Sequence, residues 1–138
     1  PSQSSAASDV YKRQLQQWVL DFTDAFNRDD LDGVMAYFAD DAVYDEFNGV
    51  RHEGKAAIRA AFEPQFSGEM GTIRFLEEDH FLDVDKGQAM ISWTCALETK
   101  RGPAGWRGLD LLRFVDGKLV EKQTYAKTKA PMLEARDA

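Results

Sequence analysis

The spacing of apolar residues changes once along this chain of 138 residues, near Gly71. Before that point apolar side chains recur at helical spacing, and the clearest stripe consists of Leu15, Trp18, Val19, Phe22 and Phe26. After it, apolar and polar residues alternate, as in strands that bury one face. Helices followed by a run of strands predict an α+β fold in which the helices pack on one face of a curved antiparallel sheet.

Turn-forming residues divide the two patterns into elements. A second short helix is expected after Asp30 and a third after Gly54. Strands are expected at 42–47, 72–84, 88–99, 104–115 and 118–127. Asn48-Gly49 and Asp116-Gly117 are expected to be tight turns between strands.

The composition favours a single domain. A chain of 15.6 kDa with 43% apolar residues can bury one core, which we expect to span residues 9–128. Residues 1–8 are small and polar, and the string PSQSSAASDVYKRQ resembles vector-derived sequence, so we expect a non-native tail there. Residues 129–138 are expected to be a second polar tail.

Charge and cysteine content argue against several classes of protein. A net charge of −7 without a basic stripe predicts no nucleic-acid or membrane partner. The longest stretch without a charge has eleven residues, Gly87 to Leu97, which is too short to cross a membrane. No basic segment leads into an apolar run, so no secretory signal is expected. Cys95 is the single cysteine, which favours a reducing, cytoplasmic location.

Asp110 is the residue that fits its expected surroundings least. It shares one face of the strand 104–115 with Trp106, Gly108 and Leu112. Because burying an unpartnered carboxylate is costly, such a residue is paired, protonated or functional. We interpret Asp110 as a candidate pocket acid; the alternative is a structural Asp that accepts hydrogen bonds from Tyr, Trp or backbone donors.

Glu46 is a second candidate, and the sequence leaves two interpretations open. If Asn48-Gly49 is a two-residue turn, Glu46 lies opposite Arg51, and Asp45 lies opposite His52. Glu46 is then either the ion-pair partner of Arg51 or a general base at the mouth of a pocket.

The remaining chemistry-bearing residues give weaker signals. His52 and His80 lack metal-ligand spacing, so no metal site is expected, and His52 is an accessory candidate for proton transfer. No nucleotide-binding or nucleophile motif occurs, and no cofactor is expected. We expect an aromatic and apolar cavity around Asp110, with a lining that consists of Trp18, Phe22, Phe38, Tyr44, Phe62, Trp93, Trp106 and Leu112.

The inward face of the last strand depends on the turn before it. A two-residue turn at Asp116-Gly117 places Gln123 and Tyr125 on the pocket face. A longer loop with a bulge instead places Lys122 and Thr124 there. In that case Lys122 is a further accessory candidate and pairs with one of the acids. The sequence leaves both registers open.

Three segments, in this order and spacing, resemble the nuclear transport factor 2-like superfamily in its ketosteroid-isomerase and SnoaL-like branch. They are FNRDDLDGVMAYFADDAVYDEFNG, EGKAAIRAAF and GLDLLRFVDGKLVEKQTY. With the first helix they cover most of residues 11–128. The resemblance implies a cone-like curved sheet with the helices on its concave face around a deep apolar pocket, and frequent homodimers through the sheet. Apolar residues on both faces of strand 104–115 also favour a homodimer.

Ketosteroid isomerases use a carboxylate base, and a tyrosine plus a protonated Asp as oxyanion donors. The resemblance places the base on Glu46 and the neutral acid on Asp110, in the segment DLLRF. The two pocket tyrosines fall on Phe22 and near Phe62, which cannot donate a hydrogen bond. The acid pair is therefore retained and the phenols are not.

We therefore expect a small-molecule pocket protein that carries out general acid–base chemistry, of isomerase, cyclase or lyase type, on a hydrophobic carbonyl compound. Glu46 would move the proton, and a neutral Asp110 would donate to the developing oxyanion. The alternative is a non-catalytic ligand-binding or dimerisation module of the same fold. A single cavity that contains both acids favours the enzyme, and a solvent-exposed Glu46–Arg51 pair favours the module.

Overall fold

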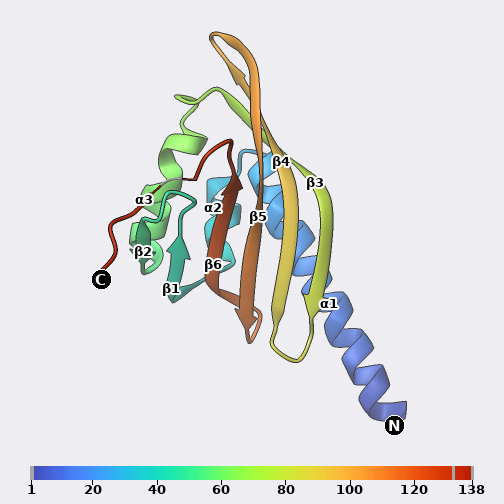
Figure 1. Ribbon diagram of the computed structural model, residues 1–138. Helices are drawn as coiled ribbons and strands as arrows, with labels where there is room; N and C mark the ends of the chain where they lie inside the picture. Colours follow the sequence, from blue (N-terminus) through green and yellow to red (C-terminus); the bar gives the residue numbers. More distant parts are fainter. Residues whose placement is uncertain (1, 132, 138) are drawn as a thin grey trace.

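A computed structural model describes residues 2–131 and 133–137 (Figure 1). Within them the elements occur in the order α1 (Ser2–Asn27), α2 (Leu31–Ala36), β1 (Phe38–Asp45), β2 (Arg51–Glu53), α3 (Lys55–Phe66), β3 (Thr72–Asp83), β4 (Gln88–Thr99), β5 (Gly102–Val115) and β6 (Lys118–Lys127). Helices come first and a meander of long strands comes last, so the expected α+β class is confirmed.

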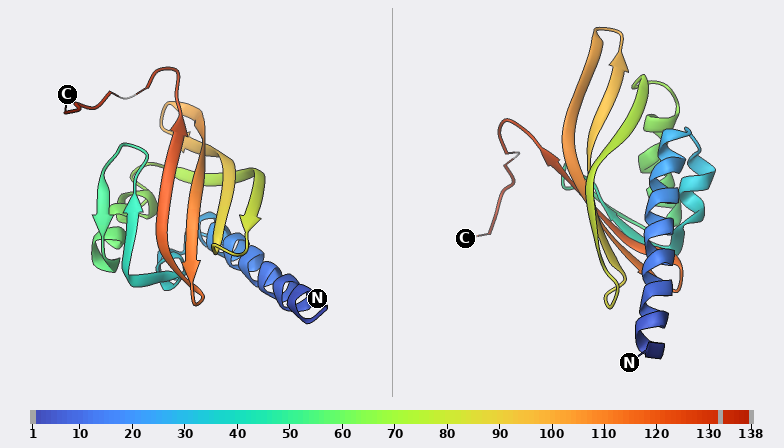
Figure 2. Two further views of the ribbon diagram at one scale, coloured as in Figure 1. Left: turned by 60° about the horizontal axis from the view of Figure 1, so that its bottom comes forward. Right: turned by 90° about the vertical axis from the view of Figure 1, so that its right-hand side faces the viewer.

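The strands form one curved, open sheet, and the helices cover its concave face (Figure 2). The strand order is β2-β1-β6-β5-β4-β3. The neighbours are antiparallel, as expected, except for β1 and β6, which run parallel. The reason is that the chain leaves β1, builds α3 and the far strands, and returns beside β1 in the same direction.

The helix α1 packs its apolar stripe against the sheet. Leu15, Val19 and Phe22 are almost fully buried, because their spacing places them on one helical face. The expected N-terminal tail continues α1 as helix over residues 2–8, and the side chains of residues 6–10 remain exposed. Among the residues that the structure describes, no helix combines the length and apolarity that crossing a bilayer requires.

A two-residue turn joins β5 to β6. Asp116 and Gly117 have φ angles of 50° and 78°, so both occupy the left-handed region that a type I′ hairpin turn needs. Glycine reaches this region without strain, and aspartate is one of the few other residues that tolerates it. This part of the sequence prediction is confirmed.

The register of β6 changes shortly after that turn. Phe114 pairs with Leu119, but Arg113 pairs with Glu121, so Val120 is an extra, bulged residue. Because side chains alternate with a period of two, one extra residue exchanges the faces of the rest of the strand. The pocket face of β6 therefore carries Lys122 and Thr124, although the turn itself has only two residues.

The β1–β2 connection is longer than the expected two-residue turn. The Glu46 N–H donates to the Val50 carbonyl at 2.9 Å, and the Gly49 N–H donates to the Glu46 carbonyl at 3.0 Å. Gly49 has φ 86°, which makes this a three-residue loop with a left-handed glycine. The pairing consequently moves by one residue, and Asp45 rather than Glu46 lies opposite Arg51.

The convex face of the sheet exposes an apolar row across three strands. Phe81, Met90 and Leu111 are cross-strand neighbours, and Phe81 and Leu111 are 62% and 40% exposed. We propose that this row is the interface of a homodimer, since a contiguous exposed apolar patch typically marks an interaction site. Light scattering at micromolar concentration should then give twice the chain mass of 15.6 kDa.

A charged residue introduced into this apolar row tests whether the row is the dimer interface. Leu111→Glu should lower the scattering mass to that of one chain, because a buried unpaired carboxylate is costly at an interface. Leu133→Glu is the matched control, since Leu133 is 90% exposed and outside the sheet. A wild-type protein that scatters as a single chain would contradict the homodimer.

Candidate active site

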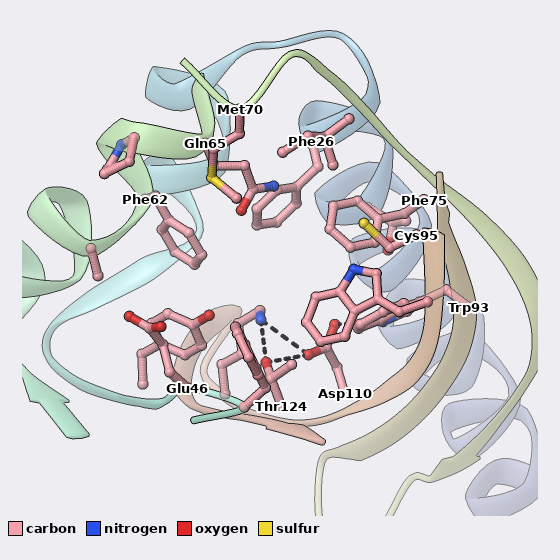
Figure 3. Close-up of a pocket in the computed structure, with 18 of the residues that line it drawn as sticks. Phe26, Glu46, Phe62, Gln65, Met70, Phe75, Trp93, Cys95, Asp110 and Thr124 are labelled. Atoms are coloured by element: carbon pink, nitrogen blue, oxygen red, sulfur yellow. Dashed lines mark hydrogen bonds and ion pairs between the residues drawn. The ribbon is translucent and has the colours of Figure 1, made fainter. Parts of the chain in front are cut away.

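One cavity of about 150 Å³ contains both sequence-predicted acids (Figure 3). It lies between the concave face of the sheet and the helices α1 and α3. Glu46 reaches it from the loop after β1, Asp110 from β5, and Lys122 and Thr124 from β6. The aromatic residues of its walls are Phe22, Phe26, Tyr44, Phe47, Phe62, Phe75, Trp93 and Trp106.

The Asp110 carboxylate accepts three side-chain hydrogen bonds. Lys122 Nζ donates to Oδ1 at 3.0 Å, and Thr124 Oγ1 donates to the same oxygen at 2.6 Å. Trp93 Nε1 donates to Oδ2 at 3.0 Å. Of the alternatives that the sequence left open for this acid, the structure shows the paired one: Asp110 forms an ion pair with Lys122.

Gly108 makes the Trp93 contact sterically feasible. Gly108 and Trp93 are cross-strand partners, and a Cβ at position 108 would lie 2.6 Å from the indole ring. Real carbon atoms do not approach so closely, so only glycine lets the indole lie across β5. In the sequence Gly108-Leu109-Asp110, the glycine therefore leaves room for the Trp93 indole, and the carboxylate that the indole contacts follows two residues later.

Lys122 is buried together with its counter-charge. Besides its bond to Asp110, Nζ donates to Thr124 Oγ1 at 2.6 Å and lies 4.4 Å from the centroid of the Tyr44 ring. Burial lowers the lysine pKa, but attraction to Asp110 and its neighbours outweighs this effect, so the pKa of Lys122 is raised above its ordinary value. Lys122 therefore remains an ammonium at neutral pH.

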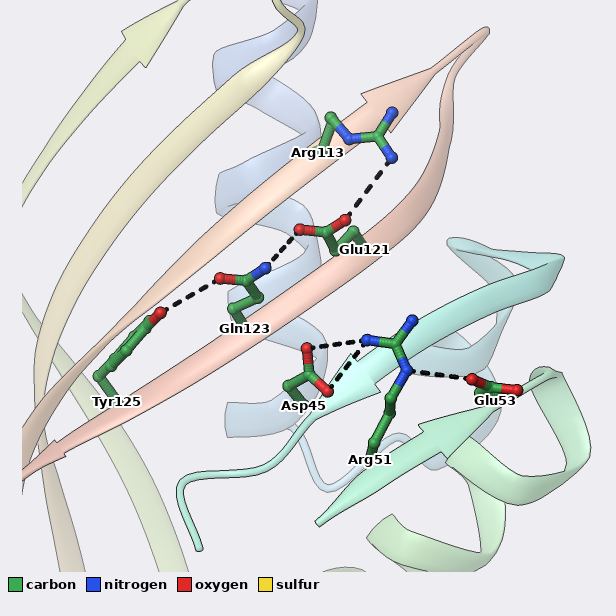
Figure 4. Close-up of polar contacts among 7 residues, drawn as sticks. All are labelled: Asp45, Arg51, Glu53, Arg113, Glu121, Gln123 and Tyr125. Atoms are coloured by element: carbon green, nitrogen blue, oxygen red, sulfur yellow. Dashed lines mark hydrogen bonds and ion pairs between the residues drawn. The ribbon is translucent and has the colours of Figure 1, made fainter. Parts of the chain in front are cut away.

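Glu46 pairs with His52 at the edge of the cavity. His52 Nε2 lies 2.7 Å from Glu46 Oε1, and each side chain is 19% exposed. Arg51 instead contacts Asp45 at 3.4 Å and Glu53 at 3.0 Å on the convex side (Figure 4). The Glu46–Arg51 ion pair is therefore wrong, and the loop register explains why.

Tyr44 brings a phenol to the cavity. It is cross-strand neighbour to both His52 and Lys122, and its ring stacks on that of His52 with centroids 5.6 Å apart. Burial raises the pKa of the Tyr44 hydroxyl, so the group is a neutral donor. Tyr44 lines the cavity as expected, but the sequence analysis placed the phenol positions at Phe22 and near Phe62, and so it did not identify Tyr44 as a donor.

The structure separates the other expected lining residues into two groups. Phe22, Phe62, Trp93 and Trp106 line the cavity. Trp18, Phe38 and Leu112 do not: Trp18 packs on Phe114, whereas Phe38 and Leu112 are fully buried in the core. Helical or strand alternation identifies a buried face but not how deep along that face the cavity reaches.

Several lining residues had no clear signal in the sequence. They include Phe47, Phe75, Met70 and Cys95. Phe47 closes over Trp106, with ring centroids 4.6 Å apart. Burial raises the pKa of the Cys95 thiol, which keeps it protonated. Among the described residues no cluster of three or more His, Cys, Asp or Glu could hold a metal ion.

The comparisons with known proteins agree on the fold. The SnoaL-like domain family matches residues 19–122. A proposed polyketide cyclase from Xanthomonas campestris pv. campestris is 19% identical with a TM-score of 0.72, covering 83% of this chain and 91% of that chain. An NTF2-like protein of unknown function from Mesorhizobium loti is 25% identical with a TM-score of 0.71, covering 84% and 93%.

A third structural relative has a described biological role. It is SalBIII, an epoxide hydrolase/cyclase-like enzyme with a role in pyran ring formation in the polyether salinomycin. It is 16% identical with a TM-score of 0.74, and the match covers 84% of this chain and 92% of that chain. No curated protein matches the chain. Likeness at these identities shows the shared fold.

The buried ion pair predicts how Asp110→Asn behaves. The variant leaves the Lys122 ammonium buried without a counter-charge, which should lower the free energy of unfolding at pH 7 by about 3 kcal/mol or more. Asp45→Asn is the matched control, because its pair with Arg51 is exposed and should contribute less than about 1 kcal/mol. Urea denaturation measures both. A more stable Asp110→Asn protein would contradict the ion pair.

The same variant should respond to pH. Without Asp110, burial would lower the folded pKa of Lys122 below the unfolded value of about 10.4. Between those two pKa values the unfolded variant binds more protons than the folded one, so its stability rises with pH. In the wild type the folded pKa is raised, so Lys122 adds no pH dependence below about 10.4. The difference in the free energy of unfolding between the wild type and Asp110→Asn should therefore become smaller from pH 7 to pH 10.

Proposed function

The chain belongs to the SnoaL-like domain family of the nuclear transport factor 2-like superfamily, and we propose that its cavity is the active site of a cofactor-independent acid–base enzyme. The reaction is of isomerase, cyclase or lyase type on a hydrophobic carbonyl compound. The observation that carries this proposal is that Glu46 and the Lys122–Asp110 pair line one aromatic cavity. The cyclase-type proteins among the structural relatives support the same class of chemistry.

Glu46 is the proton carrier of the proposed reaction. Its side chain lines the cavity, and His52 Nε2 lies 2.7 Å from Oε1, so the other oxygen is the one we assign to the substrate. The carboxylate removes a proton from the carbon next to the substrate carbonyl. The electron pair of that C–H bond forms a carbon–carbon double bond to the carbonyl carbon, while the π pair of the carbonyl moves to its oxygen. Glu46 later returns the proton to the same or another carbon, and the carbonyl re-forms.

Lys122 and Tyr44 are the donors to the developing oxyanion. An ammonium has three N–H groups, and Asp110 and Thr124 accept two of them. The third N–H and the neutral Tyr44 hydroxyl are then available to the substrate oxygen. Asp110 is a positioning residue in this scheme, because it acts through Lys122 and not as a donor.

A non-catalytic binding module is the second candidate. One observation favours it: the Asp110, Lys122 and Trp93 polar groups already satisfy one another within the protein. Such a cluster can stabilise a fold without taking part in any reaction. Proton exchange on a simple ketone separates the two candidates, because binding alone does not exchange carbon-bound protons.

Glu46→Gln should abolish exchange of the methyl protons of acetophenone in D₂O, followed by ¹H NMR. We expect a loss of about 10²- to 10⁴-fold, the usual contribution of a positioned general base. Glu53→Gln is the control, since Glu53 is an exposed carboxylate on the next strand and should exchange at the wild-type rate. A wild-type protein that binds acetophenone without accelerating exchange would establish the binding module instead.

Tyr44→Phe tests the oxyanion donors separately from the base. The ring stacking with His52 is retained while the hydroxyl is lost, so binding should change little. Loss of one oxyanion donor should slow the exchange by about 10²-fold or more. An unchanged exchange rate in the folded variant would assign oxyanion stabilisation to Lys122 alone.

A further inference from the structure

We infer that the cavity selects an uncharged ligand with a single planar ring and one carbonyl or hydroxyl oxygen, and excludes ligands with several fused rings. Only one part of this inference rests on the proposed function, namely the position of the ligand oxygen near Lys122. The limits on ligand size, shape and charge rest on three separate observations: the volume, the wall geometry and the charges of the cavity.

The volume limits the ligand to about one ring. The cavity measures about 150 Å³, and an engineered apolar cavity of this volume in another protein binds benzene. The inner wall cannot easily retreat, because its rings are buried and hold one another in place. Phe26 packs edge-on against Phe22 and Phe62, with ring centroids 5.2 and 5.3 Å apart. Moving such rings would open voids elsewhere in a close-packed core.

The wall geometry suits a flat ring. Trp93 stands nearly perpendicular to Phe75 and to Trp106, at interplanar angles of 79° and 72°. The walls therefore present both ring faces and ring edges to the cavity. Aromatic groups prefer this combination of offset-stacked and edge-to-face contacts, whereas a bulky aliphatic ligand gains only area burial.

The charges of the lining disfavour a charged ligand of either sign. Glu46 faces the cavity, and the charge of the Lys122 ammonium is already balanced by Asp110, so a ligand anion would meet the like charge of Glu46 in a desolvated site. Lys122 already occupies the cation position over the Tyr44 ring, so a ligand cation would meet the ammonium. Tyr44 and Cys95 are neutral and change neither conclusion.

The charged groups gather at one end of the cavity. Figure 3 shows Glu46 and Asp110 at this end together with Thr124, whereas Phe26, Met70 and Phe75 lie at the other end with the uncharged Gln65 amide. One ligand oxygen near Lys122 suits the charged end. A charged ligand group at the other end would find no ion-pair partner and would lose its hydrogen bonds to water.

A series of probes tests size and charge together. The dissociation constants of acetophenone, benzoate, benzylammonium and progesterone are measured by NMR titration at pH 7, in the same cosolvent. Acetophenone should bind at least ten-fold more tightly than either charged analogue, and progesterone should not bind in the cavity. The Trp93 indole N–H, which donates to Asp110, should shift only with acetophenone.

Two substitutions on α3 locate the binding. Ala61 lines the cavity, so Ala61→Phe should weaken acetophenone binding at least ten-fold. Ala60→Phe is the matched control on the exposed side of the same helix and should bind like the wild type. If Ala61→Phe does not fold, the Trp93 indole shift in the wild type still locates the ligand.

Each contrary result overturns the inference. Equal or tighter binding of benzoate or benzylammonium would overturn the charge selection, and binding of progesterone with a Trp93 shift would overturn the size limit. Unchanged binding to a folded Ala61→Phe variant would place the ligand elsewhere. Selective acetophenone binding without proton exchange would refute only the proposed function, because the selection itself would stand.

Discussion

The ion pair between Asp110 and Lys122 imposes the strictest condition on this fold, because neither charge can be buried without the other. Asp110 is on β5 and Lys122 is on β6, so the two strands must pair in a register that brings them together. Trp93 and Thr124 supply the additional hydrogen bonds that such a pair requires. The concave face can therefore be apolar almost everywhere else.

That condition is met by a single extra residue. Without the bulge at Val120, the two-residue turn would direct Lys122 and Thr124 to the convex face. Asp110 would then be an unpartnered carboxylate among aromatic rings. The bulge thus connects backbone pairing to the chemistry of the cavity, since it exchanges the faces of β6 beyond the turn and leaves the turn itself unchanged.

The loop after β1 has a similar effect on the opposite side of the cavity. Its left-handed Gly49 moves the pairing of β1 and β2 by one residue. As a result Arg51 pairs with Asp45, and Glu46 pairs with His52. Two one-residue changes in register therefore decide which charges face the cavity and which face solvent. The aromatic walls then set the dielectric environment in which those charges act.

The sequence by itself determined the class of fold, the four strands after Gly71 to within two residues at each end, and the two acids of the cavity, since periodicity and turn residues are local properties. Only the tertiary structure decided that Asp110 pairs with Lys122, that Lys122 faces inward and that Tyr44 supplies a phenol. Each of these depends on cross-strand register. A bulge changes register without leaving a distinctive residue pattern, so the partners of a buried charge are known only once the strands have paired.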